Sequence, residues 1–432
     1  MPRMNRRRFV GSLMAGAGAA ATLPMFSRSA FAQDAARLRL YWWGNPSRDE
    51  RTFTVIDLFE EANPGVQIDG ETVSWGDYWT KLATQTAGRN MPDIVQMDYR
   101  YLDEYVSRGA LHSLEEFRGG ALDLSTYEEG PLAGGMVDGE LYAINIGSNT
   151  QVALFNARIF DEVGIAFDPY GYTLEDLKRI ATEITEATGG STYGTDDNTL
   201  AYEAFETFAR QSQAPLFAAD GSIGTNEEVV GEFWEFWRSM REAGVVPPAE
   251  QSASLIGSGM NELGLITQNT AMSYLWSNQI VGAQSLSSDV LGAAMYPQKA
   301  GGVPGQYVKP SMFLAMSANT EHPEIAAKFI SDWVNDPAMT AVLGLERGIP
   351  PVPEVREALS PEFTEAERLS VGYFSEAQKH VGELPPPPPP AAGEVTDAFV
   401  RIGTEVLLDR QSISDAAAEF VGQANAIRRR AG

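Results

Sequence analysis

The sequence predicts an α/β fold, in which short buried strands alternate with amphipathic helices. Short apolar segments, which indicate strands, recur along the chain. Each is followed by a stretch in which apolar residues lie three or four positions apart, the spacing of an amphipathic helix. The chain has 432 residues, of which 44% are hydrophobic and 21% are charged. This is enough for two or three ordinary domains, and the composition favours a globular α/β protein over a disordered one.

The first half of the chain carries most of the expected strands, which span 38–43, 66–73 and 94–97, with a further extended segment over 139–146. A helix with Phe53, Ile56 and Phe59 on one face follows the first of these strands. The next two helices are expected over 78–87 and about 99–107.

The second half repeats this alternation without repeating the sequence. A capping box over 173–176 begins one helix, and strands are expected over 271–276 and 292–296. The six prolines of 385–390 predict an extended polyproline II segment, because proline cannot continue a helix. Two terminal helices follow it, over 395–408 and 413–429.

Acidic residues strongly outnumber basic ones. There are 58 Asp and Glu residues against 32 Lys and Arg, a formal net charge of −26 at pH 7. This balance argues against nucleic acid as the main partner, because phosphate contacts need a basic face. The chain has no cysteine, which removes disulfides, thiol catalysis and thiolate metal sites.

Residues 1–32 have the pattern of an export signal. They contain five arginines and no acidic residue, and an apolar run rich in Gly and Ala leads to Ala30-Phe31-Ala32. We expect cleavage after Ala32 and a soluble product in a bacterial periplasm. Arg6-Arg7-Arg8-Phe9-Val10 resembles the twin-arginine motif, whose pathway carries folded proteins. A transmembrane anchor is the alternative, although the run is weakly hydrophobic for that role.

The spacing of reactive residues nominates no catalytic or metal-binding constellation. The three histidines form no H-x-x-x-H or H-E-x-x-H pair, and paired glutamates fall on expected helices, where a solvated face is the simplest interpretation. Asp196-Asp197-Asn198 lacks the spacing and the glycine of an EF-hand loop. We therefore expect no catalytic residues, no metal and no cofactor.

Candidate ligand-binding residues lie where the expected strands end, because ligands bind beyond the carboxyl ends of strands in open α/β sheets. These residues are Trp43, Asn45, Arg48, Trp75, Asp98, Arg100, Trp276 and Asn278. Aromatic faces beside short polar groups suit a sugar, whose C–H groups pack on the ring and whose hydroxyls bind carboxylates or amides. The alternative is that the tryptophans belong to the core and that Asp98 only caps the helix at Tyr99. We also expect four further residues in the site: Asn149, Tyr202, Lys309 and Arg347.

A set of motifs occurs in a fixed order along the chain. They are FEEANPGV at 59–66, PDIVQMD at 92–98, LYAI at 141–144, LFN at 154–156, FDEVGI at 160–165, AMSYLW at 271–276, AAKFI at 326–330 and GIP at 348–350. This set resembles the sugar-type extracellular solute-binding proteins, the maltose-binding-protein-like family, over essentially the whole mature chain. There are two departures, since Asn145 stands where the family usually has proline and the lipobox cysteine is missing.

The resemblance implies a type II periplasmic binding protein fold, with two α/β lobes joined by a hinge and a ligand cleft between them. The first lobe would take 34–147 and 309–352, and the second 148–308 and 353–432. It further implies a monomeric periplasmic component of an ABC transporter. Such a protein captures a carbohydrate, here a di- or oligosaccharide, by hinge closure and delivers it to the membrane permease. A secreted carbohydrate-active enzyme and a binding protein for a non-sugar solute are the alternatives.

Within such a cleft, we expect Trp43 and Trp276 to supply stacking faces, one from each lobe. Arg48 and Arg100 lie just past strand ends that the resemblance puts at the cleft, so they favour a ligand that carries or tolerates an acidic group. Alternatively, each arginine pairs with a neighbouring carboxylate, Asp49 or Asp103, or bonds neutral hydroxyls.

Overall fold

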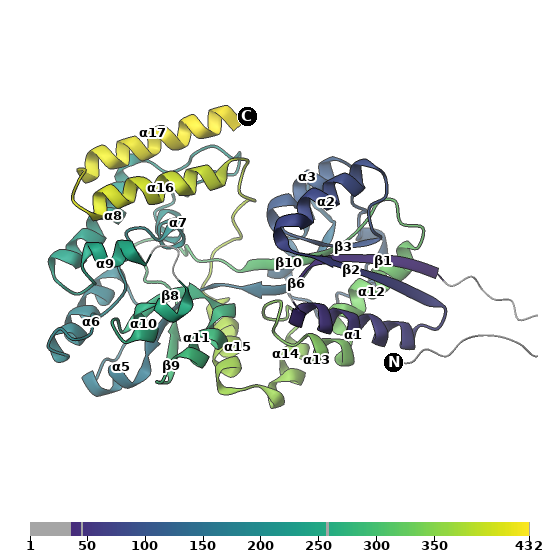
Figure 1. Ribbon diagram of the computed structural model, residues 1–432, viewed down its shortest axis with the longest axis horizontal. Helices are drawn as coiled ribbons and strands as arrows, with labels where there is room; N and C mark the ends of the chain where they lie inside the picture. The colour runs from purple at the N-terminus through teal and green to yellow at the C-terminus, as the bar shows by residue number, and fades with distance from the viewer. Residues whose placement is uncertain (1–35, 45, 256–258, 432) are drawn as a thin grey trace, which may run out of the picture. The chain divides into compact units, whose positions relative to one another are not determined.

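The computed structural model describes residues 36–44, 46–255 and 259–431. The expected export signal and Asn45 lie outside these described residues. The described chain forms two α/β lobes, each built around its own sheet (Figure 1).

The first lobe contains a five-stranded sheet with the order β2-β1-β3-β10-β6. Its strands are β1 (Ala36–Trp43), β2 (Val66–Val73), β3 (Ile94–Met97), β6 (Ala143–Asn149) and β10 (Lys309–Met316). β1 runs parallel to β2 and β3, whereas β10 is antiparallel to β3 and β6. The strands predicted over 66–73 and 94–97 are confirmed at those bounds.

Helices cover both faces of this sheet (Figure 1). One side carries α2 (Trp75–Ala87) and α3 (Tyr99–Ser107), and the other carries α1 (Pro46–Ala62), α12 (Pro323–Asn335) and α13 (Pro337–Leu343). Because both faces are covered, the consecutive residues Leu40, Tyr41 and Trp42 of β1 are all buried, although their side chains alternate between the two faces. The smaller elements are η1 (Glu115–Phe117), α4 (Glu129–Ala133), β4 (Met136–Val137), β5 (Glu140–Leu141), α14 (Pro353–Leu359) and η4 (Ser360–Glu362).

The second lobe contains a three-stranded antiparallel sheet with the order β8-β7-β9. Its strands are β7 (Gln151–Asn156), β8 (Met272–Trp276) and β9 (Leu291–Ala294). Its helices are α5 (Ala157–Val163), α6 (Leu174–Ala187), α7 (Tyr202–Gln211), α8 (Glu227–Glu242), α9 (Ala249–Ser254), η2 (Met260–Glu262), α10 (Gly264–Thr267), η3 (Ser277–Gln279), α11 (Ile280–Leu286), α15 (Glu365–Ala377), α16 (Ala392–Leu407) and α17 (Ile413–Ala431). The predicted capping box begins α6, where Thr173 Oγ1 accepts from the Asp176 amide at 3.2 Å.

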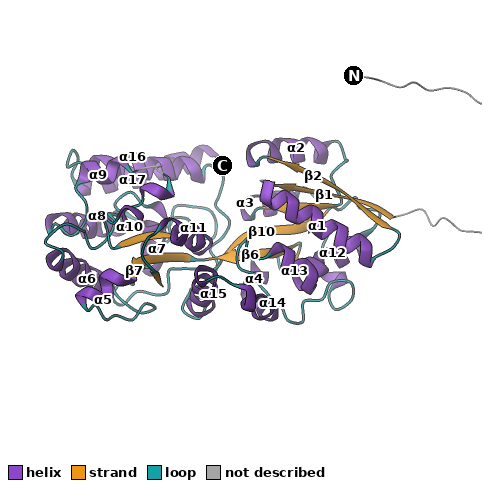
Figure 2. Cartoon of the chain, turned by 60° about the horizontal axis from the view of Figure 1, so that its bottom comes forward, coloured by secondary structure: helices purple, strands orange, loops and turns teal. Residues whose placement is uncertain are grey.

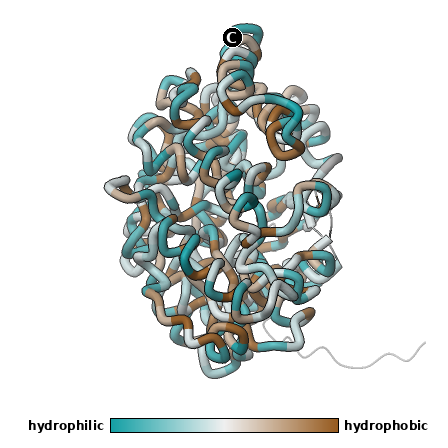
Figure 3. The backbone as a smooth tube through the Cα atoms, turned by 90° about the vertical axis from the view of Figure 1, so that its left-hand side faces the viewer, coloured by the Kyte–Doolittle hydropathy of each residue, from teal (hydrophilic) through white to brown (hydrophobic). Residues whose placement is uncertain are grey.

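The proline segment 385–390 is neither helix nor strand, in agreement with the prediction, and lies between α15 and α16. The last helix, α17, is amphipathic and buries Ala417, Phe420 and Ala424. Hydrophobic and hydrophilic residues accordingly alternate along the tube near the C-terminus in Figure 3. In the part of the chain that the structure describes, no helix is both long enough and apolar enough to cross a membrane.

The chain passes between the lobes through a buried layer of hydrogen bonds. Thr150 alone separates β6 from β7, and β6 lies beside β10 (Figure 2). The Thr150 amide donates to Ser277 Oγ at 3.1 Å, and its hydroxyl donates to the Tyr307 carbonyl at 2.9 Å. Gln306 Nε2 donates to the Gln151 carbonyl at 2.8 Å. These bonds tie the β6–β7 passage to the segment that enters β10.

Asn145, which stands where the resemblance predicts proline, organises the end of β6. The side chain is fully buried, with Nδ2 donating to Ser148 Oγ at 2.8 Å and Oδ1 accepting from the Gly147 amide at 3.1 Å. The asparagine therefore supplies hydrogen bonds that a proline could not make.

The buried apolar cores draw on separate parts of the chain. The first combines residues from 38–146 and 312–355, and the cores of the second lobe combine residues from 152–296 and 373–427. Val355 of α14 packs in the first core, although the expected boundary puts 353–432 in the second lobe.

Gly147 allows the closest backbone approach in the passage between the lobes. A Cβ added there would lie 2.2 Å from the Arg347 carbonyl oxygen. We expect Gly147→Ala to destabilise the protein by about 1–3 kcal/mol, because backbone must move to admit the methyl group. Gly422→Ala on α17, where no atom lies within 4 Å of the added Cβ, is the control and should be neutral or slightly stabilising. Urea unfolding of both variants measures the difference, and equal losses would contradict the explanation.

Candidate ligand-binding site

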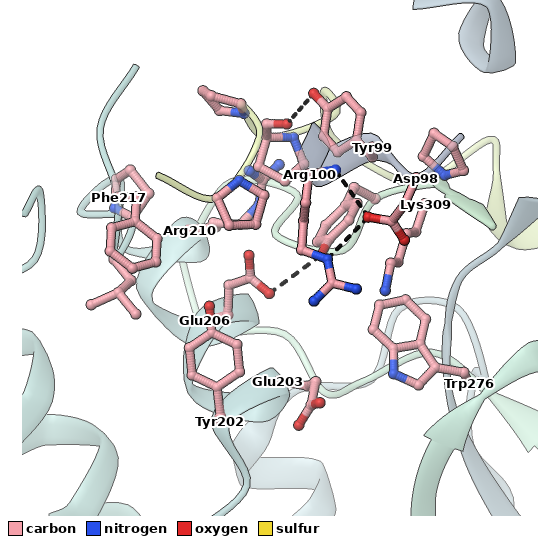
Figure 4. Close-up of a pocket in the computed structure, with 17 residues that line it drawn as sticks. Asp98, Tyr99, Arg100, Tyr202, Glu203, Glu206, Arg210, Phe217, Trp276 and Lys309 are labelled. Atoms are coloured by element: carbon pink, nitrogen blue, oxygen red, sulfur yellow. Dashed lines mark hydrogen bonds and ion pairs between the residues drawn. The ribbon is translucent and has the colours of Figure 1, made fainter. Parts of the chain in front are cut away.

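A cavity of about 260 Å³ is lined by side chains from both lobes. Its charged and aromatic walls are formed by Asp98, Tyr99, Arg100, Tyr202, Glu203, Glu206, Arg210, Trp276, Tyr307 and Lys309, and Pro385, Pro386 and Pro388 border it as well. Figure 4 shows the Arg100 guanidinium reaching into the cavity, among Glu203, Glu206 and Trp276.

The first wall forms where β3 gives way to α3. Asp98 caps α3, and its Oδ1 accepts from both the backbone amide and Nε of Arg100, each at 3.0 Å. The Arg100 guanidinium carbon lies 5.2 Å from the centre of the Trp75 ring and 5.8 Å from that of Tyr101. Asp98 therefore caps the helix and also lines the cavity.

The second wall is one face of α7, on which Tyr202, Glu206 and Arg210 recur every fourth residue. Tyr307 OH donates to Glu206 Oε2 at 3.3 Å. Burial raises the pKa of Glu206 to about 7, although Arg210 and Lys309 act in the opposite direction. Arg210 itself donates to the Gly305 carbonyl at 2.7 Å and to the Glu383 carbonyl.

The third wall lies at the carboxyl end of β8. The backbone amide of Trp276 donates to Gln279 Oε1 at 2.9 Å, and its ring meets Tyr307 edge-on. Lys309, the first residue of β10, places Nζ 4.9 Å from the centre of the Trp276 ring. A partly exposed aromatic ring thus carries a cation on its face.

The proline segment closes one side of the cavity. The Tyr99 hydroxyl donates to the Pro385 carbonyl at 2.8 Å, so the proline segment contacts α3 across the cavity wall. A wider groove of about 1120 Å³ shares Tyr99, Arg100, Pro386 and Pro388 with the cavity. The two hollows therefore adjoin along the proline segment.

Five of the predicted site residues are brought together in this cavity: Asp98, Arg100, Tyr202, Trp276 and Lys309. Six others do not line it: Trp43, Arg48, Trp75, Asn149, Asn278 and Arg347. Asn45 lies outside the described residues.

Trp43 lies in the core of the first lobe and does not line the cavity, contrary to the expectation. It is 7% exposed and packs edge-on against Trp75 and Tyr78 in the first core, so it has no open face on which a sugar could stack. Trp75 is 39% exposed but presents its ring to Arg100. Sequence alone could not separate these cases, because both tryptophans follow strands and only the packed structure shows which ring is covered.

The arginines expected at the cleft are paired within the protein. Arg48 Nε lies 3.0 Å from Glu346 Oε1, and Arg100 pairs with Asp98, so the partners differ from the Asp49 and Asp103 named as alternatives. Arg347 is buried, donates to Thr52 Oγ1 at 2.7 Å, and has its pKa lowered to about 9 by burial and by Arg48.

The two asparagines occupy different environments. Asn278 is exposed outside the cavity. Asn149 is buried opposite Lys309 in the β6–β10 pair, and its Oδ1 has no hydrogen-bond partner within the described part of the chain.

Sequence reasoning missed Glu206, Arg210 and Tyr307. The first two had a usable signal, because they lie four and eight residues after Tyr202 and so share its helix face. Tyr307 gave none, since it lies in an irregular segment before β10.

The Asp-Asp-Asn segment 196–198 stabilises the fold of the second lobe. Asp197 Oδ2 pairs with Arg241 Nη1 at 2.7 Å, and Thr270 Oγ1 donates to Asp196 Oδ1 at 2.7 Å. Across the described residues, no group of three or more His, Asp or Glu side chains is placed to hold a metal ion.

Two lobes joined by crossing strands, with a polar and aromatic cavity lined from both, define a binding protein for a small solute. The chain belongs to the bacterial extracellular solute-binding protein family, whose model matches residues 54–370. It is 21% identical over 303 residues to YcjN, a candidate ABC transporter periplasmic-binding protein of Escherichia coli (strain K12), covering 65% of this chain and 66% of that protein. The chain spans about half the length, 48%, of the Brucella binding proteins that it also matches, at 25% identity over 206 residues.

Solved structures show the same fold. An extracellular solute-binding protein family 1 member from Alicyclobacillus acidocaldarius is 28% identical with a TM-score of 0.84, covering 92% of this chain and 100% of that one. A periplasmic oligogalacturonide binding protein from Yersinia enterocolitica is 22% identical with a TM-score of 0.77, again covering 92% and 100%. The predicted family and the two-lobe fold are therefore confirmed.

The raised pKa of Glu206 should make the free energy of unfolding depend on pH. The folded protein holds this proton up to about pH 7, whereas the unfolded chain releases it near the ordinary value of 4.5. The contribution of Glu206 to the free energy of unfolding is therefore fully present at low pH. It is lost as pH rises through about 7, by roughly 3 kcal/mol in total. Glu206→Gln should remove this part of the decline in unfolding free energy between pH 5 and pH 8.

Glu186→Gln, exposed on α6 and outside the cavity, is the matched control. Urea unfolding across the pH range measures all three proteins. The explanation fails if Glu206→Gln keeps the wild-type pH profile.

Proposed function

We propose that this protein is the carbohydrate-capturing component of a bacterial ABC importer, and that it takes a di- or oligosaccharide in the cavity between its lobes. The single observation that carries the proposal is the Trp276 ring face with polar and charged groups around it. A pyranose packs its C–H groups on such a ring while its hydroxyls bind the neighbouring carboxylates and guanidinium groups.

Relatives support the class of ligand. The Yersinia enterocolitica neighbour is described as binding oligogalacturonide, and its lobes superimpose on this chain. The cavity is small for an oligosaccharide by itself, but the adjoining groove along the proline segment gives a longer chain room to extend.

Capture would depend on movement of the lobes about the passage between them. A ligand that touches Arg100 of the first lobe and Trp276 of the second stabilises the arrangement in which both are close. The loaded protein would then dock, as a monomer and without a cofactor, on the permease of the importer.

A thermal-shift screen of mono-, di- and oligosaccharides tests the proposal, because a ligand that binds only the folded state raises the melting temperature. For the saccharide that binds, Trp276→Ala should weaken affinity five- to a hundredfold, or about 1–3 kcal/mol, through loss of the stacking face. Trp276→Phe, which keeps an aromatic face, should recover most of the loss.

Isothermal titration of the three proteins, each checked for folding by circular dichroism, gives the affinities. A folded Trp276→Ala variant that binds as tightly as wild type would contradict the assignment. A peptide or other solute that binds where no saccharide does would favour the non-sugar alternative.

One observation favours a second function, a carbohydrate-active enzyme. The cavity holds three carboxylates, Asp98, Glu203 and Glu206, and a carboxyl with a pKa of about 7 suits a general acid. We favour binding, because the family and its relatives are binding proteins. Mass spectrometry of oligosaccharides incubated with the protein separates the two functions, since only an enzyme forms shortened products.

We further propose that residues 1–32 direct export and are removed, so that the mature chain begins at Gln33. Arg6→Lys with Arg7→Lys should block export, because the arginine pair precedes a weakly apolar run. Arg28→Lys, outside the motif, should export normally. Fractionation and N-terminal sequencing of the periplasmic protein decide the matter, and normal export of the double variant or a different first residue would refute it.

A further inference from the structure

We propose that Lys309 and Trp276 form one subsite that selects a negatively charged sugar ring, a uronate, whose ring stacks on Trp276 while its carboxylate pairs with the Lys309 ammonium. The inference rests on the proposed function, since it assumes that a saccharide occupies the cavity.

The Lys309 ammonium is available for an anion. Its Nζ lies over the Trp276 ring at 4.9 Å, and no carboxylate of the described chain lies within ion-pair distance of it. The other two cations of the cavity already have partners, because Arg100 Nε pairs with Asp98 and Arg210 donates to two backbone carbonyls. A carboxylate entering the cavity therefore reaches Lys309 without sharing it with a carboxylate or a carbonyl of the described chain.

The position of this ammonium matches the shape of a uronate. A pyranose ring that stacks on Trp276 takes the ring face over which Nζ now lies, and displaces the ammonium toward the ring edge. The carboxylate of a uronate projects from the edge of the sugar ring, so stacking and ion pairing are satisfied by one ligand residue. A neutral hexose gains the stacking contact but leaves the ammonium without an anion.

The charge of the cavity differs from that of the chain. Acidic residues exceed basic ones by 58 to 32 overall, whereas the cavity is lined by three carboxylates and three cations. Asp98 is neutralised by Arg100. Glu206, which faces Glu203, Arg210, Tyr307 and Lys309, holds a proton up to about pH 7 because burial raises its pKa. The cavity is therefore more favourable to an anion than the surrounding acidic surface.

The test compares acidic and neutral forms of the same ligand. A panel of uronate disaccharides, differing in sugar and linkage, is titrated calorimetrically alongside the methyl ester of each member and the matching neutral hexose disaccharides. The proteins are wild type, Lys309→Gln, Lys309→Arg and the control Lys328→Gln. Lys328 pairs with Asp332 on α12 and does not line the cavity, so this control makes the same charge change elsewhere.

We expect wild type to bind at least one uronate about 10- to 100-fold more tightly than its ester, the range of a charge-assisted hydrogen bond. Lys309→Gln should reduce this preference to within about twofold. Lys309→Arg and Lys328→Gln should keep the preference. Raising the salt concentration should weaken binding of the acid but not of the ester.

Two results overturn the inference and leave the proposed function intact. One is that esters or neutral disaccharides bind as tightly as uronates, and the other is that Lys309→Gln keeps the wild-type preference. If no saccharide of the panel, acidic or neutral, binds to wild type, the proposed function fails and the inference fails with it.

Discussion

The hydrogen bonds of Thr150 hold together the passage on which both lobes and the cavity depend. Through this buried residue β6, an edge strand of the first sheet, leads directly into β7, the central strand of the second. The pairing on either side then fixes the cavity, because Lys309 is opposite Asn149 in one sheet and Trp276 is opposite Gln151 in the other. A slip of one residue in either pair would turn these side chains to the opposite face.

Much of the architecture follows from local pattern. The strands at 66–73 and 94–97 and the helix at 99–107 were predictable to the residue. Pro64-Gly65 precedes the first strand, the second is fully buried, and a capping aspartate begins the helix. In the second lobe, β8, β9 and α6 were predictable, because α6 has a capping box that is complete in sequence, whereas the central strand β7 was not predicted. The two lobes were predicted from the family resemblance and not from local pattern, because no short-range signal tells which sheet a strand joins.

The cavity was predictable only in part, and the reasons differ by residue. Asp98 and Trp276 follow strands whose carboxyl ends do reach the cavity. Trp43 is the last residue of β1, but the helix that begins at Trp75 covers it. Arg48 pairs with a glutamate 298 positions along the chain, and no window of sequence reveals such a contact. Glu206 and Arg210 share a face of α7 with Tyr202, but no helix was predicted from the sequence over these residues.

The proline segment beside the cavity has a thermodynamic consequence of its own. Proline has a fixed φ and few conformations in the unfolded chain, so ordering Pro385, Pro386 and Pro388 costs less backbone entropy than ordering a flexible loop of equal length. The Tyr99 hydrogen bond to Pro385 therefore holds a wall that is already stiff. Such a wall stays close to one shape whether the cavity is empty or filled, and a ligand that fits it loses little affinity to the ordering of its own binding site.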